Sequence, residues 1–232
     1  MTPRVSVVVP VYNEGATINA TLSALAEAVT LPFEVLVVHD KPDDTTVPFV
    51  HAFGDDRMRP VLNEIGPGPA KAIRAGFAAA AAPTIVVSMA DGADNVAIVD
   101  DLTRLVERGC VVVAASRYMP GGAQIGGPPL KKLLSRGAGL SLYWLARVGT
   151  RDATNSFKAY SKAFIEEVGV EADTGFEVGI ELVAKARRHR RPVAEIPTIW
   201  LDRTEGESRF QVGKWLPVYL RWYRYAFGPK LS

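Results

Sequence analysis

Residues 84–95 read TIVVSMADGADN, an apolar run that ends in a cluster of acidic and amide side chains. The β-branched residues at its start are typical of a strand buried in a sheet. Asp91, Asp94 and Asn95 would then lie at the carboxyl edge of that strand, where open α/β sheets bind their ligands. Carboxylates at such an edge are oxygen ligands for a divalent cation. The competing interpretation is a solvated turn that caps the helix expected from about Val96.

On both sides of this stretch, short apolar runs alternate with segments of helical spacing. Such alternation predicts an α/β fold whose parallel strands are joined by right-handed crossovers. The polar residues that follow these strands, Tyr12, Glu14, Asp40 and Asp91, should therefore converge on one crevice. We expect strands at 5–9, 33–38, 60–62, 84–89 and 110–115, and helices at 18–26, 70–82 and 96–107, with a short helix after 46.

After Ser116 the pattern is less regular. Glycine and proline at 120–122 and 126–129 predict a flexible connection. Residues 202–212 are polar and predict a mobile loop, of the kind that often closes over a bound ligand to exclude water. The remaining pattern predicts helices at 130–148, 162–168, 176–188 and 214–227, and strands at 157–160 and 193–200.

Length and composition restrict the class of protein. The chain has 232 residues, which suits one α/β domain, and its net charge of +2 does not indicate a nucleic-acid partner. Cys110 is the single cysteine, so no internal disulfide forms, and a reducing cytoplasm is expected. The N-terminus lacks the apolar region of a signal peptide, and no apolar run is long enough for a transmembrane helix. The three histidines do not have the spacing of a zinc site.

The last segment, residues 213–232, combines aromatic and basic side chains and contains no acid. Arg221 and Arg224 lie among Trp215, Trp222 and several tyrosines. Interfacial membrane helices place rings at the headgroup level and cations toward anionic lipid. The alternative is that this helix packs on the core of its own chain. Both interpretations are correct if only one face of the helix packs on the core. We therefore divide the chain into a domain at 1–212 and a C-terminal amphipathic helix at 213–232.

With these residues assembled, the sequence resembles the GT-A fold glycosyltransferases of family 2, most closely the dolichyl- or polyprenyl-phosphate mannosyltransferase group. The resemblance covers residues 5–210 and rests on many short motifs in the family's order. The motifs with short sequences are VSVVVPVYNE at 5–14, RAGF at 74–77, ASRY at 115–118, SRGA at 135–138 and DATNSFKAY at 152–160. The longer matches are the second strand with its acidic turn at 34–46, residues 176–182, and residues 196–209, which end in DRTEGESR.

The resemblance implies a Rossmann-like, mostly parallel sheet and the inverting transfer of a sugar from a nucleotide donor to a lipid-linked phosphate. Mannose or glucose from a GDP- or UDP-sugar is the expected donor group. Asp91 and Asp94 would hold Mg²⁺ or Mn²⁺ on the diphosphate, since carboxylates suit hard cations. The nucleotide would be bound by Pro10, Tyr12, Glu14, Asp40 and Asp91.

The same resemblance assigns roles to basic residues near the transferred group. Arg117 and Arg203 are expected to act in catalysis with Asp91 by stabilising developing negative charge. Ser135, Arg136 and Arg203 would bind the acceptor phosphate, because guanidinium groups match phosphate geometry. A phosphate acceptor is already anionic, so it needs a general base less than a sugar hydroxyl does.

Two departures from the family pattern concern the donor site. The metal motif usually reads Asp-x-Asp with a later Gln, whereas this chain has Met89, Asp91 and Ala93 at those positions. Weaker metal affinity is therefore predicted. In the second turn, His39 stands where the family commonly has an acidic residue, and Pro42 also lies in this turn. Both differences bear on which nucleotide base or sugar is bound.

Two other functions are considered. A family 2 enzyme acting on a saccharide hydroxyl would need a carboxylate base, for which Asp173, Glu177 and Glu181 are available. A nucleotide-sugar-binding partner without turnover would explain Met89 and Ala93. The leading hypothesis places the enzyme in the cytoplasm, peripherally on the inner face of the cell membrane, in contact with anionic lipid.

Overall fold

The computed structural model describes residues 2–201 and 212–231. Arg203 and the loop predicted at 202–212, apart from Val212, lie outside this part of the chain. Among the helices described, none is both long enough and apolar enough to cross a membrane.

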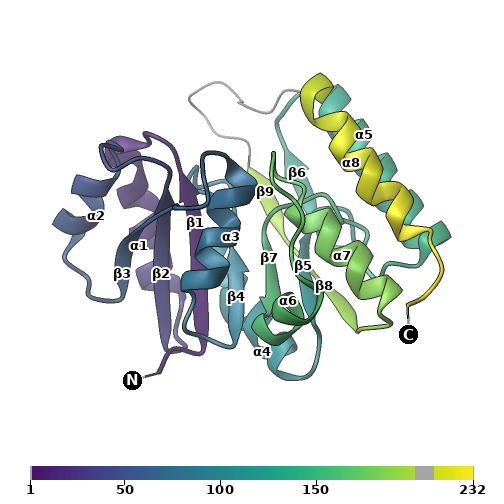
Figure 1. The fold of residues 1–232 in the computed structure, drawn as a ribbon, viewed down its shortest axis with the longest axis horizontal. Coiled ribbons are helices and arrows are strands. Elements are labelled where there is room, and N and C mark those ends of the chain that lie inside the picture. The colour runs from purple at the N-terminus through teal and green to yellow at the C-terminus, as the bar shows by residue number, and fades with distance from the viewer. Residues whose placement is uncertain (1, 202–211, 232) are drawn as a thin grey trace.

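A seven-stranded sheet runs through the centre of the molecule (Figure 1). All neighbouring strands are parallel except those that pair with β7, which is antiparallel to both β4 and β5. In spatial order the strands are β3 (Met58–Leu62), β2 (Phe33–His39), β1 (Val5–Val11), β4 (Thr84–Val87), β7 (Lys158–Ser161), β5 (Val112–Ser116) and β8 (Val193–Pro197).

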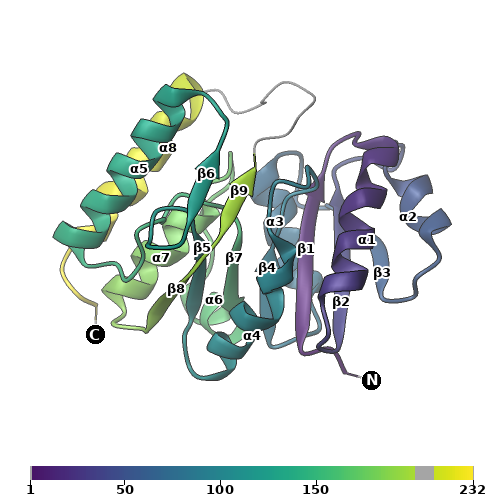
Figure 2. The same ribbon diagram turned by 180° about the vertical axis from the view of Figure 1, so that it is seen from behind.

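Helices cover both faces of the sheet. Figure 1 shows α3 and α7 over one face, and Figure 2 shows α1 and α4 over the other. The helices are α1 (Ile18–Ala28), α2 (Val47–Phe53), α3 (Pro69–Ala79), α4 (Val99–Glu107), α5 (Pro129–Ser141), α6 (Lys162–Val168), α7 (Val178–Arg188) and α8 (Val212–Ala226). Short 3-10 turns, η1 (Gly15–Thr17) and η2 (Val96–Ile98), precede α1 and α4, and a π-helical turn, η3 (Leu142–Ala146), follows α5.

The valine-rich strands form a core on each side of the sheet. In β1, Val8 packs into one cluster while Val7 and Val9 pack into the other, as the two-residue period of a strand requires. All three side chains are fully buried. Gly76 of α3 permits close approach to β1, because a Cβ there would lie 2.3 Å from Cγ1 of Val8. The expected α/β fold, with a mostly parallel sheet and flanking helices, is therefore confirmed.

The orientation of β7 differs from the parallel strands of the first half. This strand was predicted at 157–160, but it inserts antiparallel between β4 and β5, so that these two strands are not neighbours. Lys158, its first residue, pairs with Val87 and Ala114 near the ends of β4 and β5. The segment that precedes β7 therefore reaches the same edge of the sheet as the carboxyl ends of the parallel strands.

Two predicted elements, the strand at 193–200 and the helix at 130–148, are divided in the structure. The strand expected at 193–200 is interrupted at Thr198, so that β8 joins the main sheet and β9 (Ile199–Leu201) pairs in parallel with β6 (Ala123–Ile125). The connection predicted as flexible at 120–129 therefore contains a strand. The helix expected at 130–148 changes to π-helical geometry at Leu142 and ends at Ala146, because Arg147 adopts a left-handed conformation with φ 57°.

The C-terminal helix α8 docks on the domain with one face. Trp222 and Ala226 are buried in the same core cluster as residues of α7. On another side α8 runs next to α5, as both views show (Figures 1 and 2), and the Tyr223 hydroxyl donates to Ser141 Oγ at 3.0 Å. The predicted helix is thus confirmed, and its docking leaves a second face exposed.

Candidate active site

The carboxyl ends of β1, β2, β4 and β5 meet at the upper edge of the sheet in Figure 1. The segment before β7 reaches this edge as well, because β7 runs in the opposite direction. The predicted site residues that the structure describes follow these strands or lie on α5, apart from Pro10, which lies in β1 one residue before its end. Open α/β sheets bind ligands at this edge.

The turns after β1 and β2 are bonded to each other. Asp44 accepts the backbone N–H of Asn13 at 2.9 Å and that of Thr46 at 2.8 Å. Thr46 Oγ1 in turn accepts the N–H of Glu14 at 3.0 Å. Burial opposes the ionisation of Asp44, but these hydrogen bonds outweigh it and hold its pKa below the ordinary value. The predicted nucleotide-binding turn at Tyr12 and Glu14 is therefore held by a carboxylate that sequence reasoning did not single out.

Asp40, a predicted nucleotide ligand, connects the end of β2 to a glycine turn. Its Oδ1 accepts from Asn63 Nδ2 at 2.8 Å, and its Oδ2 accepts from the N–H of Gly68 at 2.9 Å. Gly66 and Gly68 both have φ of 124°, which a residue with a Cβ rarely adopts. The turn between β3 and α3 thus depends on glycine, and Asp40 fixes its position at the edge.

Asp91 and Asp94 lie in the turn after β4, where the sequence predicted a metal site. Asp91 Oδ1 accepts the N–H of Ala93 at 3.1 Å. Asp94 Oδ2 points back to the strand end and accepts from the Met89 N–H at 2.9 Å and the Ser88 hydroxyl at 3.2 Å. Burial, together with the smaller effect of the neighbouring charge of Asp91, raises the pKa of Asp94 to about 7. The two carboxylates therefore repel each other in the absence of a cation.

This pair fits a divalent cation that is held jointly with a ligand. A cation would relieve the repulsion between Asp91 and Asp94, and both supply oxygen ligands. Across the described ranges, no group of three or more His, Cys, Asp or Glu residues is placed to hold a metal ion. The remaining ligands would therefore be phosphate oxygens and water.

Arg117, predicted to act in catalysis, forms a buried ion pair with Asp152. The Arg117 Nε lies 2.7 Å from Asp152 Oδ2, its Nη2 lies 2.9 Å from Oδ1, and its backbone N–H donates to Oδ2 at 3.0 Å. The side chains are 10% and 0% exposed. Burial opposes both charges, but each partner outweighs it, so the pKa of Arg117 is raised and that of Asp152 is lowered. Both groups are therefore ionised at neutral pH.

A cluster of hydroxyl groups joins Arg117 to helix α5. Ser135 Oγ accepts from Arg117 Nη2 at 3.3 Å and lies 2.6 Å from the Tyr118 hydroxyl and 3.1 Å from Thr154 Oγ1. Burial raises the pKa of Tyr118, so its phenol remains protonated. Arg136, the next residue of α5, is exposed. The structure thus brings together two residues that the sequence assigned separately, Arg117 and Ser135.

Lys158 and Asn155 are polar residues at this edge that sequence reasoning did not assign. Lys158 is fully buried at the start of β7, and its ammonium donates to the Asn155 carbonyl. Burial lowers its pKa to about 7, against the charge of Asp152. The Asn155 side chain donates to the carbonyl of Ala115 at 2.9 Å. The motif at 152–160 was noted, but only the antiparallel direction of β7 places its polar residues in the site.

The three carboxylates considered as a base differ in their surroundings. Glu177 accepts the N–H groups of Thr174 and Gly175, and Glu181 accepts those of Glu171 and Ala172, so both buried carboxylates stabilise the start of α7. Asp173 is exposed in the same loop. Of these three carboxylates, only Asp173 is exposed and therefore able to contact an acceptor as a base.

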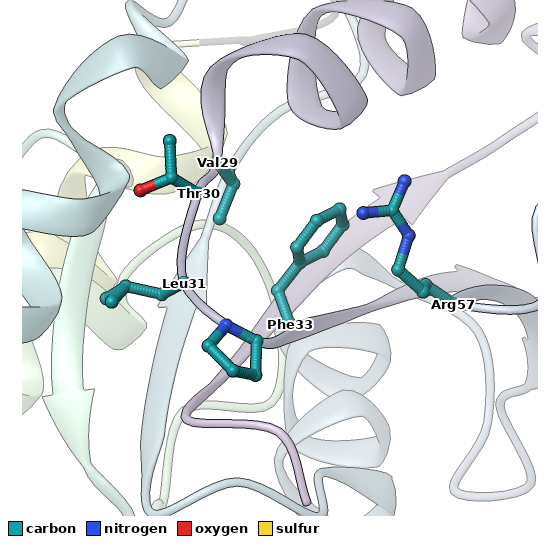
Figure 3. A pocket seen from close by; sticks show the side chains of 6 residues that line it. Val29, Thr30, Leu31, Phe33 and Arg57 are labelled. Atoms are coloured by element: carbon teal, nitrogen blue, oxygen red, sulfur yellow. The ribbon is translucent and has the colours of Figure 1, made fainter. Parts of the chain in front are cut away.

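A separate cavity lies at the opposite end of β2 (Figure 3). It measures about 390 Å³ and lies between the end of α1 and the start of β2. Arg57 stacks on the ring of Phe33 there, with its guanidinium carbon 4.3 Å from the ring centroid. Because the amino ends of the strands face it, this cavity is not part of the polar edge.

Comparison with known proteins identifies the family. The model of the glycosyl transferase family 2 matches residues 6–169. The chain belongs to this family. It is therefore a glycosyltransferase, and the resemblance found in the sequence is confirmed.

Two of three curated relatives of this family 2 glycosyltransferase are named as polyprenyl-phosphate mannosyltransferases. A dolichol-phosphate mannosyltransferase of Pyrococcus furiosus is 28% identical over 94% of this chain and 62% of its own length. An undecaprenyl-phosphate mannosyltransferase of Micrococcus luteus is 26% identical over 90% of this chain and 88% of its own. The glycosyltransferase AglD of Haloferax volcanii is 28% identical, and the chain spans 38% of it. The chain thus spans less than two thirds of two of these relatives.

Solved structures share the fold of this glycosyltransferase. Glucosyl-3-phosphoglycerate synthase from Mycobacterium tuberculosis, crystallised with Mn²⁺, UDP and phosphoglyceric acid, superposes with a TM-score of 0.72. The alignment covers 99% of this chain and 80% of that one at 18% identity. A second structure of that enzyme, with UDP alone, gives a TM-score of 0.75 at 18% identity. The GT-A fold predicted from sequence is therefore confirmed.

Proposed function

We propose that this enzyme transfers a hexosyl group, mannose or glucose, from a GDP- or UDP-sugar to a polyprenyl phosphate with inversion at the anomeric carbon. The observation that carries the proposal is the position of Ser135. Its hydroxyl lies 3.3 Å from Arg117 Nη2 at the polar edge, on a helix that also carries the exposed cation Arg136. A hydroxyl and nearby guanidinium groups suit an anionic phosphate acceptor. The names of the Pyrococcus and Micrococcus relatives support the same acceptor class.

The donor would occupy the side of the edge formed by β1, β2 and β4. Tyr12 is 43% exposed there, and the Lys41 ammonium lies 5.6 Å from its ring centroid. A ring and an ammonium at one place suit a nucleoside and its phosphates. Pro10, near the end of β1, and Glu14, in the turn, would bind the nucleotide beside Tyr12, and Asp40 would bind it from the end of β2.

Asp91 and Asp94 would hold Mg²⁺ or Mn²⁺ against the donor diphosphate. Such an ion supplies Lewis-acid stabilisation of the leaving nucleoside diphosphate. The carboxylates fix its position relative to Arg117, whose charge interacts with that of Asp94. Arg203 is proposed as a second cation for the same charge. The complex of the structurally similar glucosyl-3-phosphoglycerate synthase with Mn²⁺ and UDP is consistent with this arrangement.

In the proposed reaction an oxygen of the acceptor phosphate attacks the anomeric carbon as its bond to the nucleoside diphosphate breaks. The phosphate is already ionised, so no strong base must remove a proton. Ser135, Arg136 and Arg203 would orient the phosphate, and Asp152 would hold Arg117 in place. The chain would act at the inner face of the cell membrane, where a lipid acceptor is accessible.

A saccharide hydroxyl acceptor is the second candidate, and the exposure of Asp173 favours it. Thr174, the next residue, has its carbonyl 3.5 Å from the position of a Cβ on Gly68, so this loop borders the turn bonded to Asp40. Asp173 would serve as the base for such an acceptor. A third possibility is a partner that binds the donor without turnover.

An assay of nucleotide-sugars with short polyprenyl phosphates and Mn²⁺ or Mg²⁺ tests these candidates. We expect lipid-soluble product from the wild type and none from Asp91→Ala, with Asp101→Ala, exposed on α4, as the matched control. Transfer to a saccharide, abolished by Asp173→Asn, would support the second candidate instead. Nucleotide binding without any transfer would support the third.

A further inference from the structure

The outer face of α5 and η3 is apolar and exposed. The exposed fractions are 63% for Leu130, 69% for Leu133 and 45% for Leu134 on α5, and 68% for Trp144 and 71% for Leu145 on η3. We call these five side chains the α5–η3 face. The four most exposed large hydrophobic side chains in the described part of the chain belong to it. Apolar patches of this kind mark interaction sites rather than ordinary surface.

The charged residues of the segment that carries this face all have the same sign. Residues 109–151 contain no aspartate or glutamate. Arg136 and Arg147 are exposed on and just after these helices, and the Lys132 ammonium donates to the Gln124 carbonyl at 2.9 Å. Exposed apolar side chains flanked by cations, with a tryptophan among them, are typical of surfaces that bind anionic membranes.

Helix α8 extends the same side of the molecule. Leu216, Leu220 and Phe227 are exposed on one side of α8, while Trp222 and Ala226 dock on the core. Residues 214–232 also contain no acid, and α8 lies alongside α5 in both views (Figures 1 and 2). Its cation Arg221 is paired with Glu171. A second cation of α8, Arg224, is exposed and has no ion pair within the described residues.

Helix α5 connects this surface to the active site. Leu133 and Leu134 are exposed, whereas Ser135, the next residue, takes part in the hydroxyl cluster with Arg117 and Tyr118. One helix therefore presents leucines to the outside and a hydroxyl to the proposed acceptor site. A ligand that contacts Leu133 and Leu134 is therefore separated from the proposed acceptor site by the width of α5, about 10 Å.

We propose that the α5–η3 face docks on the surface of a bilayer that contains anionic lipid and sets Ser135 at the height of a headgroup phosphate. A second copy of the chain fits this face less well. A two-fold contact through the same patch would place Arg136 and Arg147 of one copy near those of the other. An anionic bilayer pairs with these cations and accepts the apolar side chains. The purpose of this docking, access to a lipid acceptor, rests on the proposed function. The α5–η3 face itself does not depend on which sugar is transferred.

Vesicle co-sedimentation tests the proposal. The variant Leu133→Asn/Trp144→Asn/Leu145→Asn is compared with the wild type on phosphatidylcholine vesicles with and without phosphatidylglycerol. The control is Phe49→Asn, an exposed side chain on α2 at the other end of the sheet. Thermal unfolding establishes that every variant folds. We expect phosphatidylglycerol vesicles to bind the wild type and the control equally and the triple variant at least about tenfold less.

A charge variant, Arg136→Glu/Arg147→Glu, should lose the preference for phosphatidylglycerol while it remains folded. Equal binding of wild type and triple variant overturns the proposal. A wild type that ignores vesicles but forms a dimer that the triple variant lacks also overturns it, in favour of self-association.

Transfer assays separate this proposal from the proposed function. The triple variant should transfer sugar to a short, water-soluble prenyl phosphate as well as the wild type does, and lose transfer only to acceptor in vesicles. If no prenyl phosphate accepts sugar but vesicle binding still depends on the α5–η3 face, the proposed function fails and the membrane face stands.

Discussion

Asp152 binds Arg117 with both of its carboxylate oxygens, at 2.7 Å from Nε and 2.9 Å from Nη2. Asp152 is fully buried, and it reaches this position because the segment before the antiparallel strand β7 ends at the carboxyl edge. The guanidinium group of Arg117 therefore uses its Nε and Nη2 donors on the buried carboxylate of Asp152. Arg117 can act on a bound phosphate from a fixed position, with little freedom to move toward it.

Replacing Asp152 should destabilise the fold. Asp152→Asn leaves the Arg117 cation buried without its partner, which typically costs about 3–5 kcal/mol. Urea unfolding of the variant and the wild type measures this loss. Asp101→Asn is the matched control, because the Asp101 side chain is 62% exposed and its pair with Arg104 should be worth less than about 1 kcal/mol. A loss for Asp152→Asn as small as that of the control would show that the pair contributes nothing.

The buried Lys158 should make stability rise with pH. Its pKa is lowered to about 7 in the folded state and takes the ordinary value for lysine when the chain unfolds. Between these two values the unfolded chain binds more protons, so each rise in pH favours the folded state through this group. Removal of the titrating group in Lys158→Met should abolish this contribution.

Chemical unfolding of wild type and Lys158→Met at pH 7 and pH 9.5 tests the prediction. The stability of the wild type relative to the variant should increase by about 1.4 kcal/mol per pH unit at most over this range. A difference that is the same at both pH values would contradict the lowered pKa. The exposed Lys230, replaced by Met, provides a control for the loss of one lysine.

Metal binding should be weak without nucleotide. Asp91 and Asp94 supply two carboxylates, and phosphate oxygens must complete the coordination. Calorimetric titration of Mn²⁺ should therefore show strong binding only with GDP or UDP present, and Asp91→Asn should weaken it about tenfold or more. Tight Mn²⁺ binding to the wild type without nucleotide would contradict both the predicted weak affinity and the shared site.

Removal of the Ser135 hydroxyl should affect the acceptor and not the donor. A single hydrogen bond contributes about 1 kcal/mol, so Ser135→Ala should raise the KM for a short prenyl phosphate about fivefold. Slow hydrolysis of the donor should remain unchanged. Ser141→Ala is a matched control on the same helix, because Ser141 bonds to Tyr223 instead. Equal acceptor KM values for the two variants would exclude Ser135 from the acceptor site.

Much of the fold followed from local patterns. The valine-rich runs that became β1, β2 and β4 are buried on both faces, and this burial gives them a composition that a reader of the sequence can detect. The strand predicted at 193–200 could not be bounded correctly from local patterns. Its residues are only partly buried, and Thr198 divides it between two sheets, which no local signal indicated.

The candidate site could be predicted only in part. Asp40 directly follows β2 and Asp91 lies in the turn after β4, so their position at one edge is a consequence of parallel pairing. Asp44, Asp152 and Lys158 depend on contacts between distant segments, such as the bond from Asn13 to Asp44. Their partners are set by tertiary packing, and residue type alone does not reveal them.

The sequence by itself determined the family, most of the succession of strands and helices, and the acidic turn at Asp91, because each depends on local order along the chain. The tertiary structure alone decided that β7 runs antiparallel between β4 and β5, which brings Asp152 to Arg117. It also decided which leucines of α5 remain exposed. Strand direction and helix exposure depend on which distant segments pack together, and this choice is made by the free energy of the whole fold.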